Sequence, residues 1–247
     1  MDAALVLLVV RRENTGNSRT PDFCNRTRLS EAMNLIPLLK RFAVVVCMLT
    51  AQGQAAAQLD NITLGELATT SEFCLDVQAI PITGWSKTKP SPRAAHWLSI
   101  MGEAFWGMHH YCWARIGLQR AESGRMQPSA RAFAIGVAIS DYYYVIKNSS
   151  PDFILLPEIY YRMGEARVLL GELAPALSDF ATSRKLKPDY WPPYLGEAKL
   201  LAALGKRKEA QALLKEGLSL VPDEPNLSAA LAKLAATSPG APRERKK

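Results

Sequence analysis

The fold is decided by two consecutive stretches of equal length, PEIYYRMGEARVLLGELAPALSDFATSRKLKPDY at 157–190 and WPPYLGEAKLLAALGKRKEAQALLKEGLSLVPDE at 191–224. Aligned end to end, they carry residues of the same kind at equivalent places, and the interval between the partners is always the same: Tyr160 and Tyr194, Gly171 and Gly205, Ala176 and Ala210, Phe180 and Leu214, and Pro188 and Pro222. Self-similarity at a fixed period of this length indicates a repeated structural unit.

Each stretch has the features of two helices joined by a turn. Apolar residues recur every three or four positions in 157–170 and in 190–204, which predicts amphipathic helices. Gly171 and Gly205 stand where the first helix of each unit must end. The alanine that comes shortly afterwards lets the two helices approach closely, and the proline ends the second helix.

This order of residues resembles the tetratricopeptide repeat (TPR), whose pattern places aromatic residues, a Leu-Gly pair, Ala-x3-Phe and Pro within a period of about 34 residues. The resemblance covers two units, 157–190 and 191–224, and an Ala- and Leu-rich segment at 225–237 follows them. That segment is expected to cap the last unit. The resemblance implies an all-α fold of tandem antiparallel helix pairs, a TPR-like α-solenoid with a C-terminal capping helix.

Three positions depart from the family pattern. Glu197 stands where the family has Leu, Arg167 replaces an aromatic residue, and Pro175 fits the second helix only in its first turn. Asp189 and Asp223 follow the two prolines. Because Asp is favoured at helix N-caps, both are predicted to cap the helices that come next.

The resemblance also implies a binding surface. In this family the first helices of the pairs line a concave groove that holds a peptide or a partner helix. On that basis the expected groove residues are Glu158, Tyr161, Glu165 and Val168 in the first unit and Leu195, Lys199 and Ala202 in the second. Tyr161 is expected to be exposed there, whereas Phe180 is expected in the contact between helices. Family members that bind chaperone tails have a groove rich in Lys and Asn, so the two glutamates argue against that class of partner.

Two units need further packing, since about three repeats are usually required for stability. Residues 91–156 are predicted to supply it as a divergent helical hairpin, because apolar residues recur at helical spacing in 91–123 and again in 129–147. Residues 58–90 are predicted to form a short helix near 64–77 and then a loop, because two prolines and a glycine follow.

Residues 33–57 have the order of features that is typical of a secretory signal peptide. Two basic residues precede a run of ten mostly apolar residues, and three alanines stand before the cut expected at Gln58. The run is too short for a transmembrane helix, which needs about 20 apolar residues. Because the signal begins at Met33, residues 1–32 are predicted to be a non-native or disordered extension. A buried helix at 35–49 is the alternative interpretation.

Export would leave two cysteines in the mature chain, Cys74 and Cys112. An even number of cysteines in an oxidising compartment favours a disulfide. A bridge that closes the loop between them would contribute about 3–4 kcal/mol in the chain-entropy model. Two buried free thiols would fit the sequence equally well.

All three histidines, His96, His109 and His110, lie near Cys112 in the sequence. His109 and Cys112 have i, i+3 spacing and could share a metal on one helix face, which offers an alternative function: a metal- or haem-binding protein or enzyme centred on 96–113. Such residues in a Trp-rich apolar stripe are more typical of a core. The sequence has no Cys-x-x-Cys, His-x3-His, Gly-x-Ser-x-Gly or phosphate-binding loop. We therefore predict no metal, no cofactor and no catalytic residues.

Charge does not single out a nucleic-acid partner. The chain carries 30 basic and 23 acidic residues, and the basic end at 238–247 is predicted to be a disordered tail. Nucleic-acid binding normally needs a basic stripe on a folded surface, and the body has no such run. We predict a protein or peptide partner, no nucleic acid, and no stable membrane span after signal cleavage. The expected protein is a scaffold or adaptor, periplasmic or otherwise exported in a bacterium, that serves assembly of an envelope complex.

Overall fold

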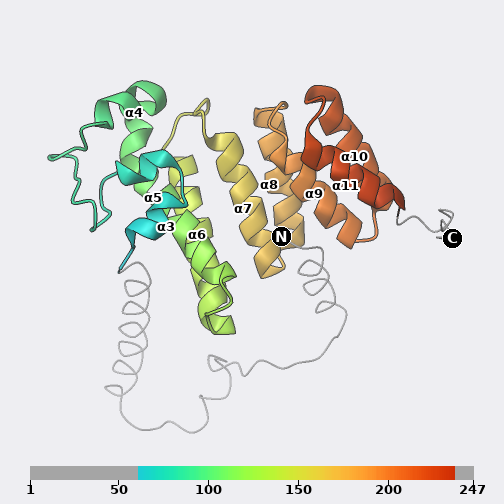
Figure 1. Cartoon of the computed structure of the whole chain (residues 1–247), viewed down its shortest axis with the longest axis horizontal. Coiled ribbons are helices and arrows are strands. Elements are labelled where there is room, and N and C mark those ends of the chain that lie inside the picture. Colours follow the sequence, from blue (N-terminus) through green and yellow to red (C-terminus); the bar gives the residue numbers. More distant parts are fainter. Residues whose placement is uncertain (1–60, 237–247) are drawn as a thin grey trace, which may run out of the picture.

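The computed structural model of the chain describes residues 61–236, and within that range every regular element is a helix (Figure 1). The helices lie side by side in a row along the long axis of the molecule, which makes the fold an all-α, TPR-like stack. In chain order they are α3 (Leu64–Ala68), η1 (Glu72–Leu75), α4 (Ala94–Met101), η2 (Gly102–Gly107), α5 (Met108–Glu122), α6 (Pro128–Lys147), α7 (Leu156–Leu170), α8 (Leu173–Leu186), α9 (Pro192–Ala203), α10 (Arg207–Leu220) and α11 (Pro225–Ala236).

The predicted extension at 1–32, the predicted signal peptide at 33–57 and the predicted tail at 238–247 lie outside the described residues.

The two repeat units have matching helix ends. Gly171 follows α7 with a φ of 81°, and Gly205 follows α9 with a φ of 80°, a backbone conformation that glycine adopts readily. At both glycines the N–H donates over 3.1 Å to the carbonyl three positions earlier, and the next N–H donates over 2.9 Å to the carbonyl five positions earlier. These bonds satisfy the last carbonyls of each helix. The constant interval between the two glycines in the sequence therefore marks helix ends at equivalent places in the two units.

The starts of the helices correct one expectation. Asp189 and Asp223 cap no helix, because Trp191 precedes α9 and Asp223 lies in a turn with a φ of 68°. Both α7 and α9 instead carry proline in their first turns, where the missing N–H has no helical partner to lose. Pro175 lies in the first turn of α8, the place where proline is tolerated.

Residues 91–123 do not form the single helix that their apolar spacing suggests. α4 ends at Gly102, whose φ of 60° breaks the helix, and the 3-10 helix η2 intervenes before α5 begins at Met108. The apolar spacing in the sequence continues across this break, and the 3-10 helix η2 still buries Phe105 completely. After the break α5 and α6 pack against each other as a hairpin next to α7.

α3 and η1 lie against α5, and the helix expected near 64–77 is divided into these two elements. Thr63 caps α3, and its partner in that cap, Glu66, also accepts a hydrogen bond of 2.6 Å from Arg120 of α5. This bond is the main reason why the pKa of Glu66 falls to about 2. The N-terminal segment is thus tied to a helix that follows much later in the chain.

The buried side chains form one continuous cluster from Ile62 to Leu169 and smaller clusters within the repeats. In the last cluster Leu227 of α11 is fully buried against Gly217 and Tyr194. A Cβ on Gly217 would stand 2.9 Å from Leu227, so the glycine lets α11 approach closely. α11 therefore covers the side of the α9–α10 pair where a capping helix is expected.

Candidate functional site

A pocket of about 160 Å³ opens between the first helices of the two repeat units. One wall is α7, the other is α9, and the floor is the ring of Phe180 from α8. The lining residues are Tyr161, Glu165, Val168, Phe180, Leu195, Gly196, Lys199 and Leu200. This volume suits a single apolar side chain, and the apolar floor is flanked by charged groups on the walls.

Glycines on both walls allow Phe180 to form the floor. A Cβ on Gly164 of α7 would stand 2.7 Å from the Phe180 ring, and a Cβ on Gly196 of α9 would stand 3.0 Å from it. Any larger residue at these positions would push the ring away. The ring is 1% exposed and packs between the two glycine-containing faces, so it joins α7, α8 and α9.

The α7 wall is held by a compact set of polar bonds. The Tyr161 hydroxyl donates to Glu165 over 2.6 Å, and Arg162 pairs with the same carboxylate over 3.1 Å. Tyr161 is half-buried, and its ring lies 6.0 Å from that of Phe180 and 6.1 Å from that of Tyr190. Burial, followed by the nearby Glu165 carboxylate, raises the pKa of Tyr161 far above its usual range. Tyr161 is therefore a packed wall residue, which corrects the expectation of a freely exposed side chain.

The same bonds continue from α7 to the N-terminal part of the molecule. Glu158 lies 3.5 Å from Arg162 and accepts a hydrogen bond of 2.7 Å from the Tyr111 hydroxyl of α5. The Tyr111 hydroxyl also lies 3.3 Å from the hydroxyl of Ser71. A polar chain thus runs from the segment before η1, through α5, to the wall of the pocket.

Five of the seven expected groove residues line this pocket: Tyr161, Glu165, Val168, Leu195 and Lys199. The other two lie elsewhere. Glu158 is occupied by Tyr111 and Arg162, and Ala202 packs against the cluster formed by α9, α10 and α11. The sequence reasoning did not identify Gly196 and Leu200 as lining residues, and it assigned Phe180 only to the helix contact. The sequence carries no direct signal for them, because Gly164 and Gly196 approach Phe180 only through the packing of three helices.

A second cleft of about 170 Å³ lies between α5 and α7 and shares Glu165 with the first pocket. Its charged lining residues are Arg115, Glu122, Arg162 and Glu165. Burial, and then the Glu165 carboxylate, raise the pKa of Glu122. The two hollows together make a longer surface across α5, α7 and α9.

The departures from the repeat pattern are matched by ion pairs. Arg167 on α7 lies 2.8 Å from Asp179 on α8, so a charge pair links the helices where the family has an aromatic contact. Glu197 on α9 lies 3.0 Å from Arg184 on α8. Each substituted position thus has an oppositely charged partner on the neighbouring helix, although the Nε of Arg167 and the Oδ2 of Asp179 do not have hydrogen-bond geometry.

The histidines do not converge on a metal site. His96 is exposed, whereas His109 and His110 lie with their rings 4.5 Å apart beside Trp113. Within residues 61–236, no group of three or more His, Cys, Asp or Glu side chains is placed to hold a metal ion. Burial, followed by the neighbouring His110, lowers the pKa of His109 to about 4.

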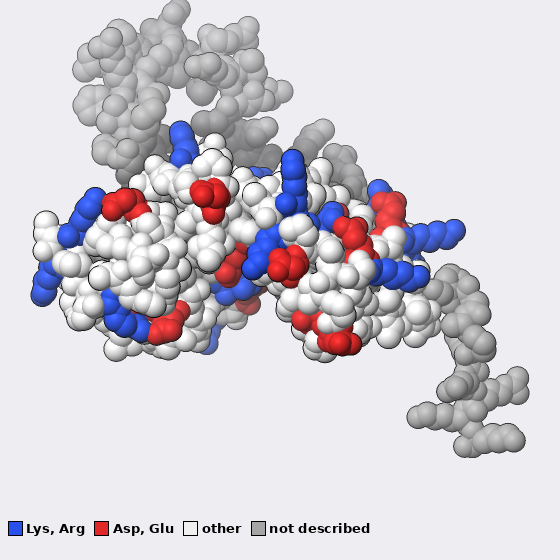
Figure 2. Space-filling view, turned by 90° about the horizontal axis from the view of Figure 1, so that it is seen from above, with Lys and Arg blue, Asp and Glu red and all other residues white. Residues whose placement is uncertain are grey.

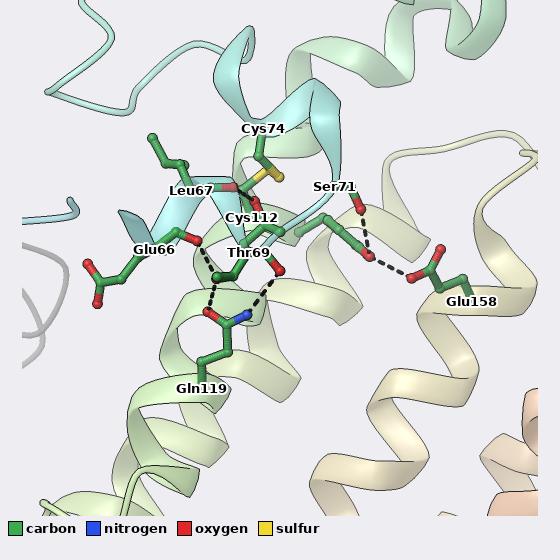
Figure 3. Close-up of a disulfide and its surroundings, with 10 residues drawn as sticks. Glu66, Leu67, Thr69, Ser71, Cys74, Cys112, Gln119 and Glu158 are labelled. Carbon is green, nitrogen blue, oxygen red and sulfur yellow. Dashed lines mark hydrogen bonds between the residues drawn. A yellow bond between two sulfur atoms is a disulfide. The ribbon is translucent and has the colours of Figure 1, made fainter. Parts of the chain in front are cut away.

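The sulfur atoms of Cys74 and Cys112 lie 2.06 Å apart, and the Cα atoms are separated by 5.7 Å. Both side chains are fully buried between η1 and α5 (Figure 3). The Cys112 sulfur thus lies beside that of Cys74, at the distance of a disulfide.

The surface has two further relevant features. On the face shown in Figure 2, basic and acidic side chains are interspersed, so no stripe of one sign crosses that face. Among the helices of the described range, none combines the length and the apolar character that crossing a bilayer requires.

The family comparison agrees with the repeat geometry. Residues 167–234 match the model of a family described as tetratricopeptide repeat. Among solved structures, the chain is similar to the first TPR of Spaghetti (RPAP3) bound to the HSP90 peptide SRMEEVD. The identity is 20%, the TM-score is 0.37, and the match covers 50% of this chain and 90% of that one. No curated protein matches the chain.

Proposed function

We propose that this tetratricopeptide repeat protein is an adaptor that holds an extended segment of a partner protein in the pocket between α7 and α9. The repeats themselves support a role in protein–protein interaction. The observation that carries the finer proposal is the open pocket, whose apolar floor is formed by Phe180 and whose walls carry Glu165 and Lys199. Such a surface offers one apolar anchor point and polar groups that orient the occupant.

The size of the pocket sets the expected strength of binding. Burying one side chain of the size of Leu or Phe contributes about 1.5–3 kcal/mol. That is less than the roughly 4 kcal/mol that corresponds to a millimolar dissociation constant. A stable complex therefore needs contacts beyond the pocket, and the cleft between α5 and α7 is next to it. We expect the partner segment to extend across both hollows.

We further propose that the protein acts outside the cytoplasm, in assembly of a bacterial envelope complex. Two observations support this location. Residues 33–57 have the order of a signal peptide, and Cys74 and Cys112 are placed for a disulfide, a bond that persists in oxidising compartments. The covalent bond between the two cysteines is part of this proposal, and no catalytic role is included in it.

Photo-crosslinking of the full chain in its native cells tests the proposal. A photoreactive amino acid replaces Lys199, which is exposed on the pocket wall, or Lys185, which is exposed on α8 and does not line the pocket. We expect a discrete adduct from position 199 and none from position 185. Recovery of the adduct in the periplasmic fraction would support the location as well.

The adduct should disappear when Leu195 on the same wall is replaced by Asp, because a charge on the half-buried wall opposes an apolar occupant. Equal adducts from positions 199 and 185, or an adduct that persists with Leu195→Asp, would reject the pocket as the binding site. Adducts found only in the cytoplasm would reject the proposed location and leave the pocket standing.

A further inference from the structure

The walls of the pocket carry opposite charges at equivalent positions. Glu165 on α7 and Lys199 on α9 are separated by one full repeat, so they occupy the same place in consecutive units. Both line the pocket, one on each side of the Phe180 floor. A segment that crosses from α7 to α9 therefore passes a negative group, an apolar floor and a positive group in that order.

Glu165 and Lys199 differ in the bonds that they already make within the protein. Each oxygen of Glu165 already accepts one bond, from Tyr161 over 2.6 Å and from Arg162 over 3.1 Å, which fixes the carboxylate in place. An ionised carboxylate has further lone pairs for a donor from a ligand. Lys199 is exposed and makes no ion pair or hydrogen bond with any side chain in residues 61–236. The two groups thus do not neutralise each other across the pocket.

The position of the Phe180 floor between the two walls determines which residues of a bound segment face Glu165 and Lys199. In an extended chain, side chains two positions apart share one face and lie about 7 Å apart along the chain. When one apolar side chain enters the pocket, the residues two positions before and after it point toward the same surface. One of these lies on the Glu165 side and the other on the Lys199 side.

We infer that the pocket selects a partner segment with an apolar residue between a basic and an acidic residue, each two positions away, the basic one on the Glu165 side. This inference rests on the proposed function and adds the charge pattern of the bound segment. Complementary charges at the rim of an interface contribute more to specificity than to affinity. The pattern therefore decides which segment binds, while the apolar anchor provides most of the affinity.

Five-residue peptides provide the test, with binding to the labelled full chain followed by shifts of the Gly196 amide in NMR titrations. The central residue is Leu, Ser fills the adjacent positions, and the outer positions are Lys and Glu, Glu and Lys, two Lys, two Glu, or two Ser. Exposed ion pairs typically change affinity by about two- to fivefold each. We expect one of the two mixed orders to bind at least about fivefold more tightly than the reverse order. This difference should shrink at 1 M salt, where charges are screened beyond about 3 Å.

The variant Lys199→Glu makes the test specific to this wall. It should change the preferred peptide from the mixed order to the one with two Lys, whereas the matched change Lys185→Glu on α8 should leave the mixed order preferred. Equal affinities for all five peptides, or a Lys199→Glu variant with the parent's preference, would overturn the inference. A sixth peptide with Ser in place of the central Leu separates the two ideas: if binding still required the central Leu in those cases, the proposed function would stand. Loss of that requirement would count against both.

Discussion

The two halves of the described chain are held together by different kinds of contact. In α7 to α11, each helix packs mainly against its neighbours in the sequence, and equivalent helix ends recur once in every unit. In the part before α7, α5 and α6 also pack as sequence neighbours, but α3 and η1 contact α5 through distant positions: Glu66 bonds Arg120, and the sulfur atoms of Cys74 and Cys112 lie at disulfide distance. The first kind of contact leaves a period in the sequence. A contact between one pair of distant residues produces no such period, because that pair occurs only once in the chain.

The largest effect is expected in the repeats, at the residue that joins three helices. Phe180→Ala should lower the free energy of unfolding by about 3–5 kcal/mol, since Phe180 is 1% exposed and truncation leaves a cavity among α7, α8 and α9. Denaturant unfolding measures it. The matched variant is Leu186→Ala on the same helix, where the side chain is 41% exposed and the cost should stay within about 0.5 kcal/mol. Similar costs for both would mean that α8 packs differently from this description.

The second effect tests whether the stability of the part before α7 depends on a bond between Cys74 and Cys112. Replacing both Cys74 and Cys112 by Ala should cost about 3–4 kcal/mol if the two are bonded, because the bond closes a long loop between η1 and α5. Alkylation of the denatured mature chain before reduction should leave both residues unlabelled. Complete labelling of both would show free thiols and would remove the covalent part of the comparison.

The fold of the repeats could be predicted from the sequence, and the reason is visible at Gly171 and Gly205. Each needs a left-handed backbone conformation at the same point of its unit, so the residue type reveals the helix end. The N-terminal half was predicted less well. Apolar spacing continues through Gly102, so the break between α4 and α5 was not apparent, and the division of 64–77 into α3 and η1 depends on contacts with α5.

The pocket was predicted in part for a similar reason. The repeat pattern assigned residues such as Lys199 and Leu195 to the inner face of α9, and both line the pocket. It could not indicate that Glu158 is occupied by Tyr111, because that bond connects positions far apart in the sequence. Tyr161 was expected to be exposed, but packing against Phe180 and Tyr190 makes it half-buried.

A third, smaller effect compares two helical glycines, one from each half. Gly164→Ala should destabilise the protein by roughly 1–2 kcal/mol, because its Cβ would stand 2.7 Å from the Phe180 ring and overpacking outweighs the gain in helix propensity. Gly136→Ala in α6 meets nothing within 4 Å and should stabilise the protein by about 0.5–1 kcal/mol. Thermal unfolding of the two variants should therefore shift in opposite directions. A stabilised Gly164→Ala variant would mean that the Phe180 ring can move aside.

The smallest effect concerns acid, and the part of it that comes from histidine lies before α7, because all three histidines lie between 96 and 110. The pKa of His109 is lowered from 6.5 to about 4, chiefly by burial and then by His110. Between these two pH values the unfolded chain binds the proton and the folded chain does not, so folding stability falls as the pH is lowered from 6.5 to 4. Since the ring is only half-buried, solvent screening keeps the effect modest.

His109→Gln should reduce this dependence, since the amide can still donate to the Trp106 carbonyl that the ring contacts over 3.0 Å but cannot titrate. His96→Gln removes an exposed imidazole and serves as the control. Denaturant unfolding at pH 7, 6 and 5 should give a shallower slope for His109→Gln than for the parent. Hydrogen exchange at pH 5 should also increase in α5 and α6 before it increases in α9 and α10. Earlier opening of the repeats would place the acid-sensitive contacts in the other half and reverse the comparison.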